Sequence, residues 1–152
     1  MSRSLARVTE ALRRAGIDAA PVAIGQCRTA AEAAASVGCA VDQIAKSIVF
    51  AAGDGCAMFL TAGGRQVDLA RAAALAGTPL ARADAARVRA VTGFAIGGVS
   101  PVGHLTPSPV WMDRHLMAFE RIWAAAGTPD HVFAVTPADL LRASGGTLAD
   151  FS

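Results

Sequence analysis

Residues 44–61, IAKSIVFAAGDGCAMFLT, decide the fold of this chain. They contain two apolar runs, residues 45–51 and 56–61, joined by Gly53-Asp54-Gly55. Glycine and aspartate at such a junction favour a tight turn, so the segment predicts a β-hairpin. Lys46 is the only lysine in the chain, and it falls at the start of the first predicted strand. An ammonium beside apolar neighbours loses hydration that they cannot replace, which makes this position unfavourable for a lysine.

Helices are predicted before and after the hairpin, each from its own start signal. Leucine and valine repeat on one face of residues 5–12, and Thr29 with Glu32 forms a capping box for a helix that ends at Gly38. Three further helices are predicted: from Asp68 to Gly77, from Asp84 to about Val91, and from Thr136 onward with Pro137 in first position.

The remaining segments predict short strands and a turn. The turn covers residues 41–45, and the strands cover residues 19–24, 94–97, 110–113, 116–123, 131–135 and 147–151. Strands with helices at the start, middle and end indicate an α+β (mixed α/β) fold, a mixed β-sheet with surrounding helices. A length of 152 residues predicts a single domain over residues 1–152.

Composition excludes several classes of protein. No apolar run reaches the roughly 18 residues of a membrane span, because glycine and charge interrupt each one, so we expect a soluble protein. Three cysteines without C-x-x-C spacing argue against a zinc knuckle or a disulfide framework and favour the cytoplasm. The histidines lack the i, i+4 spacing of a helical metal pair, so we expect no metal and no cofactor. A net charge of +2 is too small for wrapping DNA, but it allows a grip on a few phosphates at one end of an RNA.

A glycine-rich segment, GFAIGGVSPVGH over residues 93–104, is the densest loop. Gly97 and Gly98 allow unusual φ angles and close approach of a ligand to the backbone, and Pro101 fixes the far side of the turn. Exposed N–H groups in such a loop suit a phosphate or a developing oxyanion. A purely structural turn is the alternative interpretation.

Two sharper motifs are excluded. A phosphate-binding P-loop needs glycine directly before its lysine, and Ala45 precedes Lys46. A serine-hydrolase elbow needs G-x-S-x-G, but Val102 takes the last position and Pro101 removes the N–H after Ser100. Lys46 itself has two interpretations: a strand-end lysine whose stem packs while its ammonium reaches water, or a charge held beside a pocket for a phosphate or a carbonyl.

The histidines carry weaker predictions. His104 directly follows the glycine loop, within possible reach of a substrate, although a loop histidine is more often solvated. His115 and His131 default to structural roles. Asp68 is interpreted as a helix cap and not as a catalytic base.

Three motifs in order resemble one family. They are A-x-x-x-G-C-x-x-x-x-I-A-K-S-I-V-F, V-D-L-A-R-A-A-A-L-A-G and T-G-F-A-I-G-G-V-S-P-V-G-H, and they are similar to the YbaK/ProX-type aminoacyl-tRNA deacylases. That family shares its fold with the editing domain inserted in bacterial prolyl-tRNA synthetases. The resemblance runs from about Thr29 to the C-terminus, and its most specific parts are Lys46 and the G-x-x-x-P loop of residues 97–101.

The resemblance implies a free-standing hydrolase acting in trans editing, which supports translation fidelity. Its substrate would be the ester between a wrong amino acid and the 3′ adenosine of a tRNA. The tRNA for proline is the expected tRNA, with prolyl-tRNA synthetase as a possible partner. Lys46 would anchor the tRNA end, and Gly97, Gly98 and Pro101 would shape the carbonyl site. A hydroxyl of the substrate ribose would position the attacking water, so no protein nucleophile or metal is required. The other class is a non-catalytic module that only holds aminoacyl-tRNA or a small ligand.

Further substrate-binding residues implied by the resemblance are Ile96, Val99, Ser100, His104 and His131, the last as a limit on pocket size. The chain also departs from its relatives: it has no tyrosine to line the pocket, and Arg71 stands where lysine is common. Residues 95–99 offer small and aliphatic walls without a polar group for a substrate hydroxyl. We therefore expect tRNA(Pro) carrying alanine, cysteine or 2-aminobutyrate to be cleaved faster than serine or threonine, with proline spared.

Overall fold

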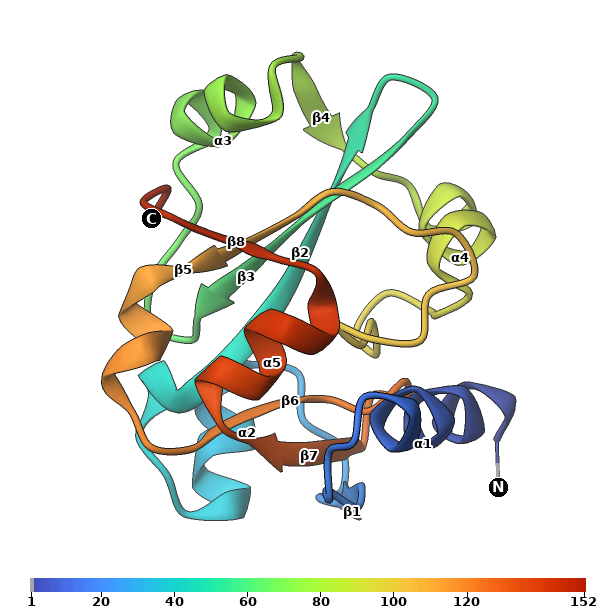
Figure 1. Cartoon of the computed structure of the whole chain (residues 1–152), viewed down its shortest axis with the longest axis vertical. Helices are drawn as coiled ribbons and strands as arrows, with labels where there is room; N and C mark the ends of the chain where they lie inside the picture. The colour runs from blue at the N-terminus through green and yellow to red at the C-terminus, as the bar shows by residue number, and fades with distance from the viewer. Residues whose placement is uncertain (1) are drawn as a thin grey trace.

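The computed structural model describes residues 2–152, and a mixed eight-stranded sheet forms its centre (Figure 1). Seven strands run in the order β1-β7-β6-β2-β3-β5-β8, and β4 pairs with β2 outside this path. The strands are β1 (Val22–Ala23), β2 (Ile44–Ala52), β3 (Gly55–Ala62), β4 (Leu80–Arg82), β5 (Val110–Asp113), β6 (Ile122–Ala125), β7 (His131–Val135) and β8 (Thr147–Ala149). The predicted α+β fold with a mixed sheet is confirmed.

The predicted hairpin is the longest strand pair in the sheet. β2 and β3 are antiparallel in continuous register from Ala45 opposite Ala62 to Ala52 opposite Gly55. The turn between them has Gly53 at a φ of +56°, a conformation that glycine adopts without strain. Both faces of β3 are buried, because β2 and β5 flank it and core clusters cover its two sides.

The other edge of β2 is divided between two partners. Ile44 and Ala45 pair with β6 in parallel, and Phe50 to Ala52 pair with β4 in antiparallel register. Within residues 2–152, no strand pairs with residues 46–49 on the side away from β3. We call this four-residue segment, residues 46–49, the open edge of β2.

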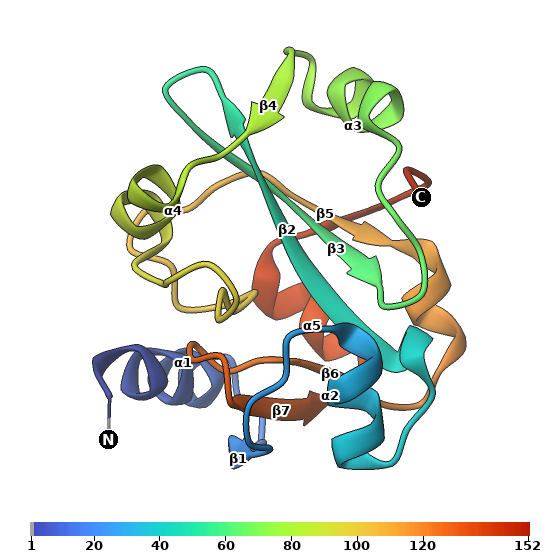
Figure 2. The same ribbon diagram turned by 180° about the vertical axis from the view of Figure 1, so that it is seen from behind.

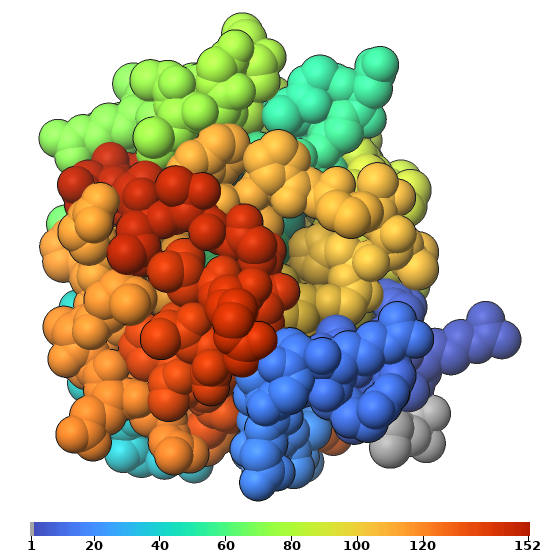
Figure 3. All heavy atoms as spheres, viewed as in Figure 1, coloured from blue at the N-terminus to red at the C-terminus, as the bar shows by residue number. Residues whose placement is uncertain are grey.

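Five α-helices surround the sheet: α1 (Arg3–Arg14), α2 (Ala30–Val37), α3 (Leu69–Ala76), α4 (Ala85–Thr92) and α5 (Pro137–Ser144). The two views show α5 on one face of the hairpin and α2 on the other (Figures 1 and 2). In the space-filling view α5, red, lies beside the end of α1, blue (Figure 3), where Arg142 donates a hydrogen bond to the Ala15 carbonyl at 2.8 Å.

The helix start signals are confirmed with one difference. Thr29 Oγ1 accepts a hydrogen bond from Glu32 N–H at 3.1 Å, and Asp68, Asp84 and Thr136 cap α3, α4 and α5 in the same way. The Glu32 carboxylate, however, accepts from the N–H of Arg28 at 3.0 Å, one residue before the cap. This bond ties the loop before α2 to the first turn of the helix.

Several predicted strands are wrong or misplaced. Residues 94–97 form no strand, because Gly97 has a φ of +93° and Gly98 N–H closes a turn onto the Ala95 carbonyl at 3.0 Å. The segment 116–123 divides into a 3₁₀ helix, Arg114–Ala118, and β6; Asp113 caps that helix by accepting from His115 N–H. The predicted strand 19–24 is reduced to β1, after Pro21, which has no N–H to donate.

Two other differences concern short elements. The turn predicted at residues 41–45 is a 3₁₀ helix, Val41–Gln43, after which β2 starts at Ile44. β4 was not predicted, because three residues are too few to show the alternation of apolar and polar side chains of a strand.

No helix within residues 2–152 has the length and apolar character needed to cross a membrane.

Candidate active site

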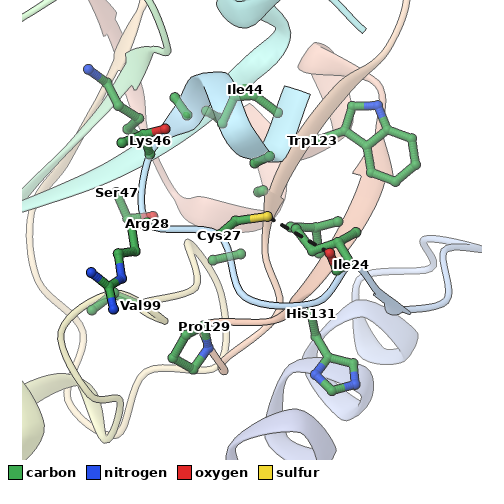
Figure 4. Close-up of a pocket in the computed structure, with 18 of the residues that line it drawn as sticks. Ile24, Cys27, Arg28, Ile44, Lys46, Ser47, Val99, Trp123, Pro129 and His131 are labelled. Carbon is green, nitrogen blue, oxygen red and sulfur yellow. Dashed lines mark hydrogen bonds between the residues drawn. The ribbon is translucent and has the colours of Figure 1, made fainter. Parts of the chain in front are cut away.

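A pocket of about 340 Å³ lies at the open edge of β2 (Figure 4). Its wall combines β2 residues 44–48, the loop before α2, the glycine loop at residues 96–99, β6, and the segment 128–132. The pocket therefore occupies the place where a neighbouring strand would otherwise pair with residues 46–49. Lys46, Ser47 and Ile48 of the open edge line this pocket.

Lys46 extends from this wall, with its ammonium held by the chain itself. Lys46 Nζ donates a hydrogen bond to the Arg65 carbonyl oxygen at 2.6 Å. Burial lowers the pKa of Lys46 below its ordinary value, and the charges of Asp42 and Asp113 oppose this shift only in part. An ammonium has three donors, so two remain for a ligand after the bond to Arg65.

The Arg65 segment is fixed by a buried carboxylate. Arg65 Nε donates to Ser152 Oγ at 2.8 Å, and Ser152 Oγ donates to Asp113 Oδ2 at 3.0 Å. Asp113 also accepts from the N–H of Ala62 and from the backbone and ring of His115. Burial alone would raise the pKa of Asp113, but these hydrogen bonds outweigh it and lower the pKa. The carboxylate thus stays charged and holds the turn that carries the Arg65 carbonyl.

The glycine loop lines the same pocket as Lys46. Ile96, Gly97 and Val99 line the pocket, with Ile96 57% exposed at its rim and Val99 buried. Gly98 is not among the lining residues, and a Cβ placed on it would lie 2.8 Å from the carbonyl carbon of Thr128. Gly98 therefore allows the loop to pack against the backbone of residues 128–129, which form another part of the pocket wall.

The rest of the G-x-x-x-P loop lies behind the pocket. Ser100 is fully buried, and its hydroxyl accepts from Val102 N–H at 3.3 Å. His104 Nε2 donates to the Ser100 carbonyl at 2.6 Å, with the ring edge-on to Phe94. Burial lowers the pKa of His104 more than its bond to Ser100 raises it. Pro101 and His104 border a separate cavity of about 240 Å³, so the structure does not place Ser100, Pro101 or His104 on the Lys46 pocket.

His131 lies at the pocket edge, at the start of β7. Its Nδ1 lies 2.7 Å from Thr128 Oγ1 and 3.1 Å from Asp130 Oδ1, which orient the ring. The structure thus brings Lys46, Ile96, Gly97, Val99 and His131 to one pocket. Their roles toward a substrate remain predictions.

Sequence reasoning missed five polar residues of this pocket, which are Cys27, Arg28, Thr29, Ser47 and Thr128. Arg28 is an exposed loop residue, and Figure 4 shows its side chain and that of Lys46 extending in different directions. Cys27 Sγ lies 3.5 Å from Ser36 Oγ. Alternation along β2 was the one available sequence signal for Ser47, because Ser47 interrupts the apolar face of Ala45 and Val49.

Within residues 2–152 no cluster of three or more His, Cys, Asp or Glu side chains is placed to hold a metal ion.

Comparison with known proteins gives this geometry a context. Residues 25–143 match the family model of the aminoacyl-tRNA editing domain. The uncharacterized protein YwhH of Bacillus subtilis (strain 168) is 29% identical over 113 residues, which cover 74% of this chain and 72% of that protein.

Two solved structures are similar over the whole chain. A candidate trans-editing enzyme for prolyl tRNA synthetase is 44% identical, with a TM-score of 0.94 over 100% of this chain and 98% of that one. A structure from work on computational epitope grafting onto scaffold proteins is 42% identical, with a TM-score of 0.93 over 100% and 99% of the two chains.

Proposed function

Because the chain belongs to the aminoacyl-tRNA editing domain family, we propose that it is a trans-editing deacylase that hydrolyses the ester of a mischarged tRNA. The observation that carries this proposal is that Lys46 and the loop at Gly97 line one and the same pocket. A cation suits the phosphate–ribose end of the tRNA, and a glycine loop suits the acyl carbonyl.

The residues of the glycine loop have different roles toward the substrate carbonyl. Gly98 N–H is already bonded to Ala95, whereas the N–H groups of Gly97 and Val99 have no hydrogen-bond partner within residues 2–152. We assign these two N–H groups as donors to the carbonyl oxygen, where negative charge develops as water attacks. Gly98 acts through its close packing on Thr128, and Pro101 acts through the shape of the loop.

The reaction needs only the substrate, water and these contacts. Water adds to the ester carbonyl carbon, the bond from that carbon to the ribose oxygen breaks, and the oxygen takes a proton. The products are the free amino acid and a tRNA with its terminal hydroxyl restored. A neighbouring ribose hydroxyl of the substrate positions the attacking water.

We further propose tRNA(Pro) carrying a small amino acid as the substrate and prolyl-tRNA synthetase as the partner enzyme. This rests on the 44% identity to a candidate trans-editing enzyme for prolyl tRNA synthetase. The pocket supports a small acyl group, because Ala45, Ala124 and Val99 form part of its wall. By size alone, alanine, cysteine and 2-aminobutyrate are the candidate amino acids.

A single-turnover assay with a panel of mischarged tRNAs tests the proposal. With enzyme in excess of substrate, a deacylase releases the amino acid, whereas a binding module retains intact aminoacyl-tRNA. We expect release from tRNA(Pro) carrying a small amino acid and little from prolyl-tRNA(Pro). Retention of every aminoacyl-tRNA without release would establish the binding module instead.

A further inference from the structure

Ser47 carries an unusual hydroxyl group. Among the residues that the structure describes, Ser47 Oγ is the only buried side-chain nitrogen or oxygen without a hydrogen-bond partner. Ser47 also lines the pocket at the open edge of β2. Buried hydroxyls are normally bonded, so a lone one in a ligand pocket indicates that a ligand supplies the partner.

The surroundings of Ser47 identify the part of the substrate that reaches it. Successive side chains of a strand point to opposite faces, so Ser47 faces away from Lys46 and toward the side of Ala45 and Val49. Ala45, Val99 and Ala124 belong to one buried apolar cluster, and all three also line the pocket. The Ser47 hydroxyl is therefore a polar group next to apolar wall residues, with almost no surface accessible to water, and it is separate from the cation expected at the phosphate–ribose end.

We propose that Ser47 sets the side-chain specificity of the pocket by hydrogen bonding to an aminoacyl side chain that carries a hydroxyl, as serine does. This inference rests on the proposed deacylase function and names its substrate class. The Ser47 hydroxyl can donate one hydrogen bond and accept others, so a second hydroxyl satisfies it in either direction. A side chain that ends in a methyl group leaves Ser47 unpaired and buried, which disfavours its binding.

Two nearly isosteric substrates isolate this interaction. Serine and 2-aminobutyrate differ only by a hydroxyl in place of the terminal methyl group. Ser47 therefore favours serine over 2-aminobutyrate, which reverses the order expected from the glycine loop alone. A site that bonds to a substrate hydroxyl discriminates against the analogue that lacks it, because its own polar group is left unpaired.

The experiment compares single-turnover rates on tRNA(Pro) charged with serine or 2-aminobutyrate. Wild type, Ser47→Ala and Ser47→Thr are measured together with Ser108→Ala, a half-buried serine outside this pocket. We expect the serine-to-2-aminobutyrate rate ratio to fall about 10-fold in Ser47→Ala, the typical effect of one hydrogen bond. Ser47→Thr keeps a hydroxyl and restores the ratio in part, and Ser108→Ala keeps the wild-type ratio.

Other outcomes overturn the inference. An unchanged ratio in Ser47→Ala, or an equal fall on both substrates as expected for a bond to the shared α-amino group, means that Ser47 does not read the side chain. Calorimetric binding of seryl- and 2-aminobutyryl-adenosine, each linked by a non-hydrolysable 3′-amide, gives the same comparison without turnover. A Ser47-dependent preference for the seryl analogue in a protein that cleaves neither ester would refute the deacylase and leave the Ser47 assignment standing.

Discussion

The ammonium nitrogen of Lys46 lies 2.6 Å from the carbonyl oxygen of Arg65. Arg65 follows β3, the second strand of the hairpin, in the sequence. A backbone carbonyl orients the ammonium without neutralising it. Lys46 is therefore a fixed positive charge at the pocket, supported through Arg65, Ser152 and Asp113.

Replacing Lys46 tests the importance of that charge. We expect Lys46→Ala to fold normally, because Lys46 is only partly buried and its removal opens no large core cavity. The single-turnover rate should fall on the order of 10² to 10³, the usual loss for one electrostatic donor. Circular dichroism and thermal unfolding check the fold, and a rate near that of wild type would remove Lys46 from the site.

The pH profile follows from the direction of the Lys46 pKa. Burial places this pKa below its ordinary value of 10.5, so the required cation is lost at a lower pH than for a free lysine. The rate should stay level while Lys46 is protonated and fall as the pH rises through the lowered pKa. Lys46→Arg stays charged over this range and should show its fall at higher pH, if it retains activity. Rates are measured after subtracting uncatalysed ester hydrolysis, and identical profiles for both proteins would rule out Lys46 as the titrating group.

Arg28 is expected to contribute to binding more than to chemistry. Its exposed guanidinium borders the pocket in a place where it can meet a tRNA phosphate. Arg28→Ala should raise the enzyme concentration that gives the half-maximal rate several-fold, with little change in the rate at saturation. The dependence of this concentration on salt should also weaken, by the amount expected for the loss of about one phosphate contact. Arg71→Ala on α3, which is not among the residues lining the pocket, provides the matched control. A fall confined to the saturated rate would place Arg28 at the reaction centre instead.

The two neighbouring glycines should respond differently to alanine. A Cβ on Gly98 would lie within 3.0 Å of three backbone atoms of Thr128 and Pro129, whereas a Cβ on Gly97 meets nothing within 4 Å. Gly98→Ala must displace the pocket wall, so its single-turnover rate should fall more than that of Gly97→Ala. Gly97→Ala carries only the strain of its positive φ, about 1–2 kcal/mol. Equal rates for the two variants would show that the contact of Gly98 with residues 128–129 does not shape the site.

Cys27 gives a chemical probe of the pocket. Its thiol is not required by the proposed reaction, so Cys27→Ala should retain most of the activity. A maleimide attached to Cys27 should block the pocket and inactivate wild type, while Cys27→Ala stays active after the same treatment. Mass spectrometry identifies the modified cysteine, because Cys39 is also partly accessible. Full activity with Cys27 completely modified would place the substrate elsewhere.

Local signals explain why much of the fold was predictable. The hairpin depends on two adjacent apolar runs and a glycine turn, and the helices begin at caps such as Thr29 and Asp84, all within a few residues of sequence. The misplaced strand at 94–97 shows the limit of that approach. Aliphatic residues there resemble a strand, but the positive φ of Gly97 makes a turn.

The pocket depends on pairing between distant segments, which explains why only part of it was predictable. β6 and β4 pair with opposite ends of β2, and no local pattern shows that residues 46–49 are left between them. Lys46 stood out because it is the only lysine. Arg28 is one of many arginines, and its position on the same pocket as Lys46 is apparent only once α2 is packed against β2.

The open edge of β2 also bears on aggregation. An unpaired strand edge is normally a template for another chain, and proteins cover or shorten such edges. Here the unpaired stretch is four residues, about 13 Å at the usual rise of a strand, with β6 and β4 closing it at either end. A second protein strand has no room to extend along it. The sheet can therefore leave these residues open to a pocket without offering a site for fibre-like association.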